Sequence, residues 1–399
     1  MPMITPARAA SIRWGMCAHL GDVDHKDHDV TALCRAAGAT SVRTNARPGN
    51  PRGIEQAREL LAAGITLHAP LPTPKDWRKP GALANAARAY LDEMTRAGVE
   101  LNSVEFANEF NGNGEGWADV VRREMAGVAA VCAEAGVTFL GPSLLAYRTE
   151  QDAPAIAQDA DGQPLHRHYP AGVAVHSYTA GDDPETSRTL TRLATVRATF
   201  GGDVPAMLTE TGYISDPTCE GYTDPERQAT LAPRLALAYL APAPGQSSPT
   251  FAGLWWYELL DEPHDTRGPR ERSRGFFTAT GEPKPAASAL SWLAEVLRDT
   301  GDAATTFTPV PLDIDVTGGE GLTWRLLQKS GRVYRLAVWH TGSGTADVRV
   351  TLARKIAGLR RFDQGDTDGE PLRADKGGKT FTVPGVGQRV TVLRIRMPK

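Results

Sequence analysis

The chain has 399 residues, of which 41% are hydrophobic and 23% charged, a composition typical of a globular protein with a sizeable core. Its length suits two domains. The 44 Lys and Arg against 47 Asp and Glu leave a formal net charge of -3, which excludes a broad attraction to nucleic acid or an anionic membrane and suits a neutral substrate.

The cysteines and the first residues of the chain indicate the cellular compartment in which the protein is expected. The four cysteines lie far apart without metal-finger spacing, so free thiols are expected. Residues 1–11 lack the apolar core of a signal peptide, and no apolar run approaches the ~20 residues that span a bilayer. We therefore expect no membrane partner and, unless a leader has been removed, a cytoplasmic or non-classically released protein.

The first three hundred residues repeat one pattern, in which a short apolar run ends in polar residues and is followed by a segment with helical periodicity. This pattern predicts alternating strands and helices. The predicted strands are 12–19, 40–45, 66–69, 103–108, 138–142, 173–176, 206–209 and 252–257. The predicted helices are 30–37, 53–63, 83–97, 117–135, 184–200, 225–240 and 285–298, and after residue 142 only 153–158 is available for a helix.

Eight strands with helical crossovers most simply close into a (β/α)8 barrel, also called a TIM barrel, over residues 1–301. An open doubly wound sheet is the competing arrangement. Neither GxGxxG nor GxxxxGK[ST] follows an early strand, so the nucleotide-binding form of that competitor has no motif to support it.

From residue 302 the pattern changes to strands of period two without convincing helices. The predicted strands are 321–328, 332–340, 346–352, 379–383 and 388–397, separated by glycine-rich turns. They predict a small antiparallel β-sandwich over residues 302–399. Because no long Pro or Ser tract separates the domains, we expect the sandwich to pack firmly on the barrel.

Two glutamates fall where a barrel presents its reacting groups. Asn108 and Glu109 come at the end of the fourth predicted strand, and Glu210 ends the seventh. Since the carboxyl ends of barrel strands form the open face, both carboxylates should face one cleft. Glycoside hydrolysis needs such a pair, one as proton donor and one as nucleophile or base. A separation of about 5 to 5.5 Å gives retention, and a wider one gives inversion.

An Asn-Glu at strand four with a second Glu ending strand seven resembles clan A of the glycoside hydrolases, which are retaining (β/α)8-barrel enzymes. Arg43 ends the second strand, as an arginine does in many clan members. The segment His176-Ser-Tyr178 is similar to the His-x-Tyr at strand six. A barrel followed by a carboxyl-terminal sandwich is most similar to family 39 and its relatives.

The resemblance implies a role for each residue that matches. Glu109 would be the general acid/base, and Asn108 would bind the sugar 2-hydroxyl. Glu210 would be the nucleophile that forms the glycosyl-enzyme. Tyr178 would donate a hydrogen bond to Glu210. The function that follows is retaining hydrolysis of a β-type glycosidic bond by double displacement.

Strand eight, within 253–262, also resembles the clan, in which a tryptophan at this point forms the floor beneath the reacting sugar. Trp255 is expected to take that place, with Trp256 as the alternative. Arg43 and His176 complete the predicted substrate site, although each could instead serve only a structural ion pair or hydrogen bond.

The resemblance implies a carbohydrate as partner, and neither a cofactor nor a metal. The sugar, the linkage, the choice between internal and terminal cleavage and the oligomeric state stay open. The long loop 146–170 is expected to wall one side of the cleft. The basic stretch 267–274 is interpreted as a solvated loop in preference to a polyanion site.

Two other functions were weighed against this one. Residues 22–29 carry His and Asp at ligand-like spacing, which would suit a metal-dependent barrel hydrolase. However, the His-x-His that such enzymes need on strand one is absent, and His166-Arg-His168 comes too late. A non-catalytic carbohydrate-binding barrel would keep only the aromatic platform, whereas both carboxylates and their Asn and Tyr helpers are present.

Some acids near the predicted site receive no firm role. Glu105 lies on the same side of strand four as Glu109 if that strand is regular, and is either a buried structural acid or part of the site. Glu258, Asp261 and Glu262 are further acids near strand eight.

Overall fold

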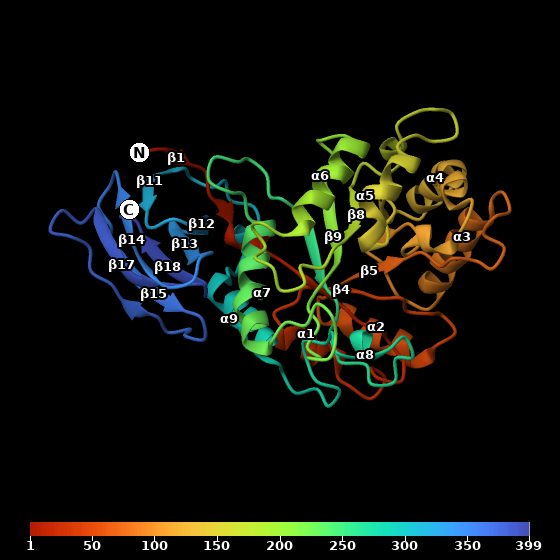
Figure 1. The fold of residues 1–399 in the computed structure, drawn as a ribbon, viewed down its shortest axis with the longest axis horizontal. Helices are drawn as coiled ribbons and strands as arrows, with labels where there is room; N and C mark the ends of the chain where they lie inside the picture. The colour runs from red at the N-terminus through yellow and green to blue at the C-terminus, as the bar shows by residue number, and fades with distance from the viewer. Residues whose placement is uncertain (399) are drawn as a thin grey trace.

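A computed structural model of the chain describes residues 1–398, and its centre is a ring of parallel strands (Figure 1). Eight of them pair in the order β7-β6-β5-β4-β3-β10-β9-β8. A parallel bridge between Gly141 and Val173 joins the two ends of this sheet, so the predicted barrel closes. The strands are β3 (Gly15–Cys17), β4 (Ser41–Arg43), β5 (Thr66–Pro70), β6 (Ser103–Glu105), β7 (Thr138–Leu140), β8 (Val173–His176), β9 (Ala206–Thr211) and β10 (Gly253–Trp256).

Helices cover the outside of the barrel, and every predicted helical segment before residue 142 and after residue 176 is present. They are α1 (Val30–Ala36), α2 (Pro51–Ala62), α3 (Ala82–Arg96), α4 (Trp117–Glu134), α6 (Arg188–Phe200), α7 (Pro225–Leu240) and α9 (Pro285–Leu297), with the short α8 (Pro269–Arg272) between β10 and α9. Local sequence sets their starts. In α2, for example, the Asn50 side chain accepts a hydrogen bond from the Gly53 N–H, and Pro51 occupies the first helical position.

The crossover from β7 to β8 departs from the regular pattern. It consists of the one-turn helix α5 (Thr149–Asp152) and three 3-10 turns, η3 (Ala146–Arg148), η4 (Ala153–Ile156) and η5 (Leu165–His168). The expected helix at 153–158 is therefore wrong. Pro154 fixes the backbone near the start of that stretch and removes one N–H donor, so a single 3-10 turn forms in place of a longer helix.

Two further sheets form the predicted sandwich, with strand orders β1-β11-β14-β17 and β16-β15-β18-β13-β12-β2. Their apolar faces enclose a core separate from that of the barrel. The strands are β1 (Met3–Ile4), β2 (Ala7–Arg8), β11 (Leu312–Thr317), β12 (Leu322–Lys329), β13 (Val333–His340), β14 (Ala346–Leu352), β15 (Gly358–Asp363), β16 (Glu370–Pro371), β17 (Thr380–Val386) and β18 (Thr391–Arg396). Two of them come from the amino terminus, which a division into 1–301 and 302–399 leaves out.

The sandwich packs firmly against α7 and α9, which lie between it and the rest of the barrel in Figure 1. Arg325 of β12 donates to the Ala238 and Ala241 carbonyls at the end of α7. Trp339 of β13 donates from Nε1 to Glu185 at 2.7 Å. These buried contacts tie the two domains together without a linker between them.

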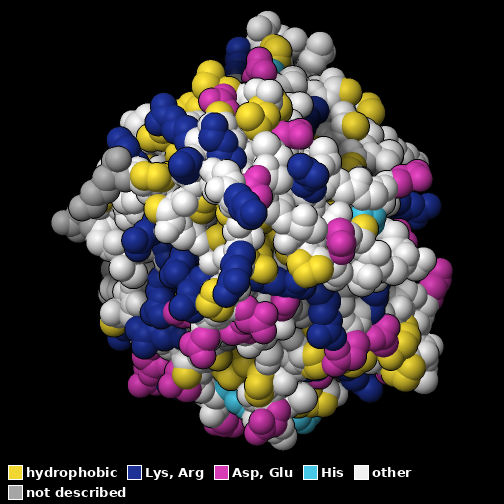
Figure 2. All heavy atoms as spheres, turned by 90° about the vertical axis from the view of Figure 1, so that its left-hand side faces the viewer, with side chains coloured by type: hydrophobic (Ala, Val, Ile, Leu, Met, Phe, Trp, Pro, Cys, Tyr) yellow, Lys and Arg dark blue, Asp and Glu magenta, His cyan; other side chains and the backbone are white. Residues whose placement is uncertain are grey.

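Charge is divided unevenly between the two parts. Residues 302–399 contain 16 of the 44 Lys and Arg but only 10 of the 47 Asp and Glu, so this part is net positive and residues 1–301 are net negative. Figure 2 looks onto the sandwich end, where Lys and Arg side chains gather. In the sheet that contains β13, β18 and β15, Arg335 and Arg360 are the direct neighbours of Arg394. Arg335 is buried, and its Nε donates to the Val296 carbonyl of α9.

All four cysteines are free thiols, as expected. Among the described residues, none of the helices combines the length and the apolar character needed to cross a membrane.

Candidate active site

A cavity of about 1260 Å³ opens at the carboxyl ends of the barrel strands. It brings together five of the seven residues predicted for the site, and a sixth, His176, contacts three of them. The five that line it are Arg43, Asn108, Glu109, Tyr178 and Glu210. Ala146 and Tyr147 line it as well, so the start of the loop 146–170 does form part of the wall.

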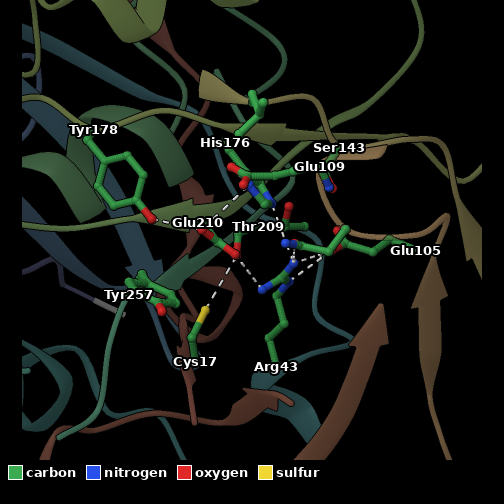
Figure 3. A network of polar contacts seen from close by, with 12 residues as sticks. Cys17, Arg43, Glu105, Glu109, Ser143, His176, Tyr178, Thr209, Glu210 and Tyr257 are labelled. Carbon is green, nitrogen blue, oxygen red and sulfur yellow. Dashed lines mark hydrogen bonds and ion pairs between the residues drawn. The ribbon is translucent and has the colours of Figure 1, made fainter. Parts of the chain in front are cut away.

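Glu210 lies within β9, and partners hold both oxygens of its carboxylate (Figure 3). Arg43 Nη1 donates to Oε1 at 2.8 Å, and Tyr178 Oη donates to Oε2 at 2.8 Å. Burial acts to raise the pKa of Glu210, but the charges of His176 and Arg43 and the Tyr178 hydrogen bond outweigh it and hold the pKa below its usual value. Glu210 is therefore an ionised, oriented carboxylate.

Glu109 lies just beyond the end of β6, in a turn that carries it towards Glu210. Its φ of 45° falls in the left-handed region, which residues other than glycine seldom adopt and which concentrates at functional sites. Its N–H lies 3.3 Å from Ser143 Oγ, and its side chain is about a quarter exposed, more than that of Glu210. Glu109 is thus the more accessible carboxylate of the two.

His176 lies between the two carboxylates. Its Nδ1 is 3.0 Å from Glu109 Oε1 and 3.5 Å from Glu210 Oε2. One oxygen of Glu109, one of Glu210 and one nitrogen of His176 all lie within 4.8 Å of one another. The two glutamates therefore face each other across a gap that one reacting centre can fill.

Arg43 connects the carboxylates to the barrel interior. It donates from Nε to Glu105 Oε1 at 3.0 Å, and its Nη2 hydrogen-bonds both Glu105 and Asn108. Burial acts to raise the pKa of Glu105, but the Arg43 charge and His68 lower it well below its usual value. Glu105 is thus the buried ion-pair partner of Arg43. Since Asn108 Oδ1 accepts from Arg43, the Asn108 amide N–H groups are available to a ligand.

The structure does not bring Trp255 to this cavity. Its ring packs on His68, with centroids 5.0 Å apart, and it lines a second cavity together with Ser41 and Thr66, the first residues of β4 and β5. That cavity is at the opposite end of the barrel. A Cβ on Gly15 would lie 2.2 Å from the Trp255 ring, so β3 needs glycine there.

The alternative, Trp256, points outward and is fully buried against Tyr213 and Phe276. The aromatic residue that the end of this strand brings to the cavity is Tyr257, whose ring meets Tyr178 edge to face at 6.4 Å. The aromatic residue beneath the sugar was therefore predicted one layer of side chains too deep in the barrel. Because side chains alternate along a strand, the residue two positions beyond Trp255 shares its side but lies at the open end.

Most of the basic stretch 267–274 is exposed, as expected for a solvated loop, including Arg267, Arg270 and Arg272. Arg274 is the exception: it is buried, pairs with Glu271 at 2.9 Å and places its guanidinium 4.4 Å above the Tyr178 ring. Arg267 donates to Tyr257 Oη at 3.1 Å. These arginines brace the two tyrosines of the site. No motif in the sequence distinguishes such arginines from surface ones.

No protein-family model matches the chain, and no curated protein matches it. Solved structures do match. A family 39 glycoside hydrolase from the gut symbiont Bacteroides cellulosilyticus WH2 aligns with 98% of this chain and 81% of its own, at 17% identity and a TM-score of 0.64.

A GH30 endoxylanase from Clostridium papyrosolvens C71 aligns with 99% of this chain and 98% of its own, at 13% identity and a TM-score of 0.61. An endo-β-1,6-glucanase aligns with 99% of this chain and 92% of its own, at 13% identity and a TM-score of 0.57. The expected fold, a (β/α)8 barrel followed by a small β-sandwich, is confirmed over nearly the whole chain.

Proposed function

We propose that the protein is a glycoside hydrolase that cleaves a β-type glycosidic bond in an oligo- or polysaccharide with net retention. Glu109 is the general acid/base and Glu210 the nucleophile. The observation that carries this proposal is the approach of their carboxylate oxygens to within 4.8 Å. Retaining enzymes hold their carboxyl groups about 5 to 5.5 Å apart, whereas inverting ones need roughly 6.5 to 9.5 Å to admit a water molecule.

The surroundings of each carboxylate support its role. The lowered pKa of Glu210 keeps it ionised, as a nucleophile must be. Glu109 is more exposed and has no arginine partner, so it is free to exchange a proton with substrate and water.

In the first step the Glu109 carboxyl donates its proton to the glycosidic oxygen while a Glu210 oxygen attacks the anomeric carbon. The bond from that carbon to the glycosidic oxygen breaks, and the first product leaves as an alcohol. In the second step the Glu109 carboxylate takes a proton from water, whose oxygen attacks the same carbon and releases Glu210. Arg43 holds the side chains of Glu210 and Asn108 in position through its hydrogen bonds to both. The Asn108 amide donates a hydrogen bond to the sugar 2-hydroxyl.

The size of the site supports an extended substrate. Its 1260 Å³ exceed the roughly 300 to 1,000 Å³ of a pocket for one small molecule. Two structures that share the fold are, by their descriptions, an endoxylanase and an endo-β-1,6-glucanase. We therefore place a glycan of several rings in the cavity, with Tyr257 against one of them.

The test is the configuration of the first product. A panel of β-linked oligosaccharides is screened for cleavage, and the anomer that appears first is followed by NMR. We expect the β-anomer. An α-anomer as first product would overturn the double-displacement mechanism, and a protein that binds glycans without turnover would point to the non-catalytic alternative. Activity that disappears in EDTA, returns with metal and survives Glu210→Gln would favour a metal-dependent hydrolase.

A further inference from the structure

A second group of acids and histidines borders the cavity, apart from the Glu109–Glu210 pair. His19 follows β3, and Glu258 and Glu262 follow β10. His19 Nδ1 lies 2.5 Å from Glu262 Oε1 and 3.6 Å from Glu258 Oε2. One donor atom from each of the three lies within 4.8 Å of the other two. Three potential metal ligands from two strand ends therefore converge on one point.

His19 is partly buried and contacts Glu262, whereas Glu258 and the neighbouring His25 are fully buried with polar atoms that lack partners. Glu258 is fully buried, and neither of its oxygens accepts a hydrogen bond from the described residues. His25 is also fully buried, with its Nδ1 3.3 Å from Glu262 Oε1, and neither ring nitrogen makes a hydrogen bond within the described chain. Buried polar groups in native proteins nearly always have partners, because leaving one unsatisfied costs free energy.

The cations nearby are already paired with other acids. Lys284 Nζ lies 2.7 Å from Asp261, and Arg274 pairs with Glu271. Arg267 pairs with Asp265. Arg267 and Arg274 act on Glu258 only from a distance, and among the described residues no arginine or lysine forms an ion pair with either carboxylate of the cluster. Burying charge that is only partly compensated is costly.

We propose that this cluster binds one divalent transition-metal ion, with zinc as the first choice, through His19 Nδ1, Glu258 and Glu262. A doubly charged ion balances the two carboxylates. Imidazole together with carboxylate suits zinc or manganese better than calcium or magnesium, which prefer oxygen alone. Ligands about 2.0 to 2.1 Å from zinc in a tetrahedron lie roughly 3.3 Å apart, close to the 3.6 Å between His19 and Glu258. The 2.5 Å contact between His19 Nδ1 and Glu262 Oε1 is a hydrogen bond, which the ion replaces as these two atoms move apart.

His25 and the open side of the cluster complete the site. His25 packs against Glu262 and orients that carboxylate from outside the ligand sphere, as outer partners of metal ligands do. His19 and Glu262 line the cavity, which gives the ion a path of entry and leaves a fourth position for water or a sugar hydroxyl. Because Tyr257 directly precedes Glu258, the ion would also hold the chain that presents Tyr257.

This inference does not depend on the reaction proposed above. Of the histidine-rich cluster at 22–29, only His25 takes part, and the proposed ligands come from elsewhere in the sequence. The competing structure is a metal-free one in which Glu258 and Glu262 share a proton.

The experiment uses the full chain without a histidine tag. The protein is dialysed against EDTA and then metal-free buffer, and Zn²⁺ or Co²⁺ is added. Bound metal is counted by mass spectrometry after gel filtration, and the melting temperature is recorded with and without Zn²⁺. We expect one equivalent of metal, visible d–d absorption bands with Co²⁺, and a higher melting temperature with Zn²⁺.

Variants assign the ion to its site. His19→Ala and Glu262→Gln should weaken metal binding at least tenfold. His264→Ala and Glu220→Gln, whose residues line the same cavity outside the cluster, should bind as the unchanged protein does. Glu210→Gln should also retain the metal.

Two results would overturn the proposal. One is the absence of stoichiometric binding by the folded unchanged protein, which would leave the shared-proton structure. The other is binding that survives His19→Ala but is lost in Glu210→Gln, which would assign the metal to the catalytic pair. If Glu262→Gln does not fold by circular dichroism, the Co²⁺ spectrum of the unchanged protein and His19→Ala still decide.

Discussion

His176 Nδ1 lies 3.0 Å from Glu109 Oε1, so a fully buried imidazole at the end of β8 contacts the more exposed carboxylate of the site. Burial acts to lower the pKa of His176, but the Glu210 charge and the Glu109 hydrogen bond outweigh it and raise the pKa above 6.5. Arg43 Nη2 lies 3.4 Å from His176 Nε2, and the Arg43 charge acts against the raised pKa without cancelling it. In its protonated form His176 offsets part of the repulsion between the two glutamates.

Stability should fall at alkaline pH through His176. Its pKa is higher in the folded than in the unfolded chain, so its contribution is complete below about 6.5 and is lost as the pH rises through the folded value. We expect the difference in unfolding free energy between the unchanged protein and His176→Asn to shrink by on the order of 1 kcal/mol between pH 6 and 9. Denaturant titrations measure it, with exposed His264→Asn as control. A constant difference would contradict the charged imidazole.

Removing the Glu210 carboxylate should remove turnover while leaving a space for an external nucleophile. We expect Glu210→Gly to lose roughly 10⁴-fold or more in kcat, and azide to restore activity with an α-glycosyl azide as product. Product NMR identifies the azide anomer. A β-azide from Glu210→Gly would show that Glu210 is not the nucleophile. Glu109→Gly is the matched comparison, because azide should rescue this variant with a β-glycosyl azide as product.

The Tyr178 hydroxyl should set the acid limit of activity. Its hydrogen bond to Glu210 Oε2 is one of the causes that lower the Glu210 pKa, so Tyr178→Phe should raise that pKa. We expect the acidic limb of the kcat/KM profile to move to higher pH and the rate to fall about tenfold or more, as loss of a hydrogen bond to a charged group implies. If the rate falls but the acidic limb of the kcat/KM profile stays at the same pH, Tyr178 has only a packing role.

Arg43 should be essential to stability because its loss strands a buried charge. Arg43→Met leaves Glu105 without its guanidinium partner, and breaking a buried ion pair in this way costs about 3 to 5 kcal/mol. Adding Glu105→Gln should recover part of the loss. Arg52→Met, which removes an exposed ion pair with Glu55, should cost about 1 kcal/mol or less. Chemical denaturation compares the three, and equal losses for Arg43→Met and Arg52→Met would refute the account.

The two aromatic residues of β10 and its end should separate stability from binding. Trp255→Ala should cost about 3 to 5 kcal/mol of stability because the ring fills the barrel interior against Gly15 and His68. The KM of Trp255→Ala should change little. Tyr257→Ala should raise KM roughly fivefold through loss of a stacking contact. Steady-state kinetics at a temperature where both variants are folded decide, and the reverse pattern would restore Trp255 as the platform.

The order of the strands could be predicted from the sequence, and with it the residues that lie at the strand ends. Glu109 and Glu210 could be found because each closes an apolar run at the fourth and seventh strands, and the structure brings both to one cavity. Trp255 was misplaced because the sequence does not say which of two inward positions reaches the open end. Arg274 and His19 reach the cavity on loops that come together only in the folded chain. The strands at Met3–Ile4 and Ala7–Arg8 are too short to show periodicity.

Those two amino-terminal strands have a consequence for expression of separate domains. Residues 3–8 pair with β11 and β12, so the first strands of the sandwich wait for partners that are synthesised about three hundred residues later. A fragment cut after residue 301 would keep β1 and β2 without their partners, and unpaired strand edges invite association between molecules. The barrel by itself is thus a candidate for inclusion bodies, whereas a fragment that keeps residues 3–396 retains every strand pair of the sandwich.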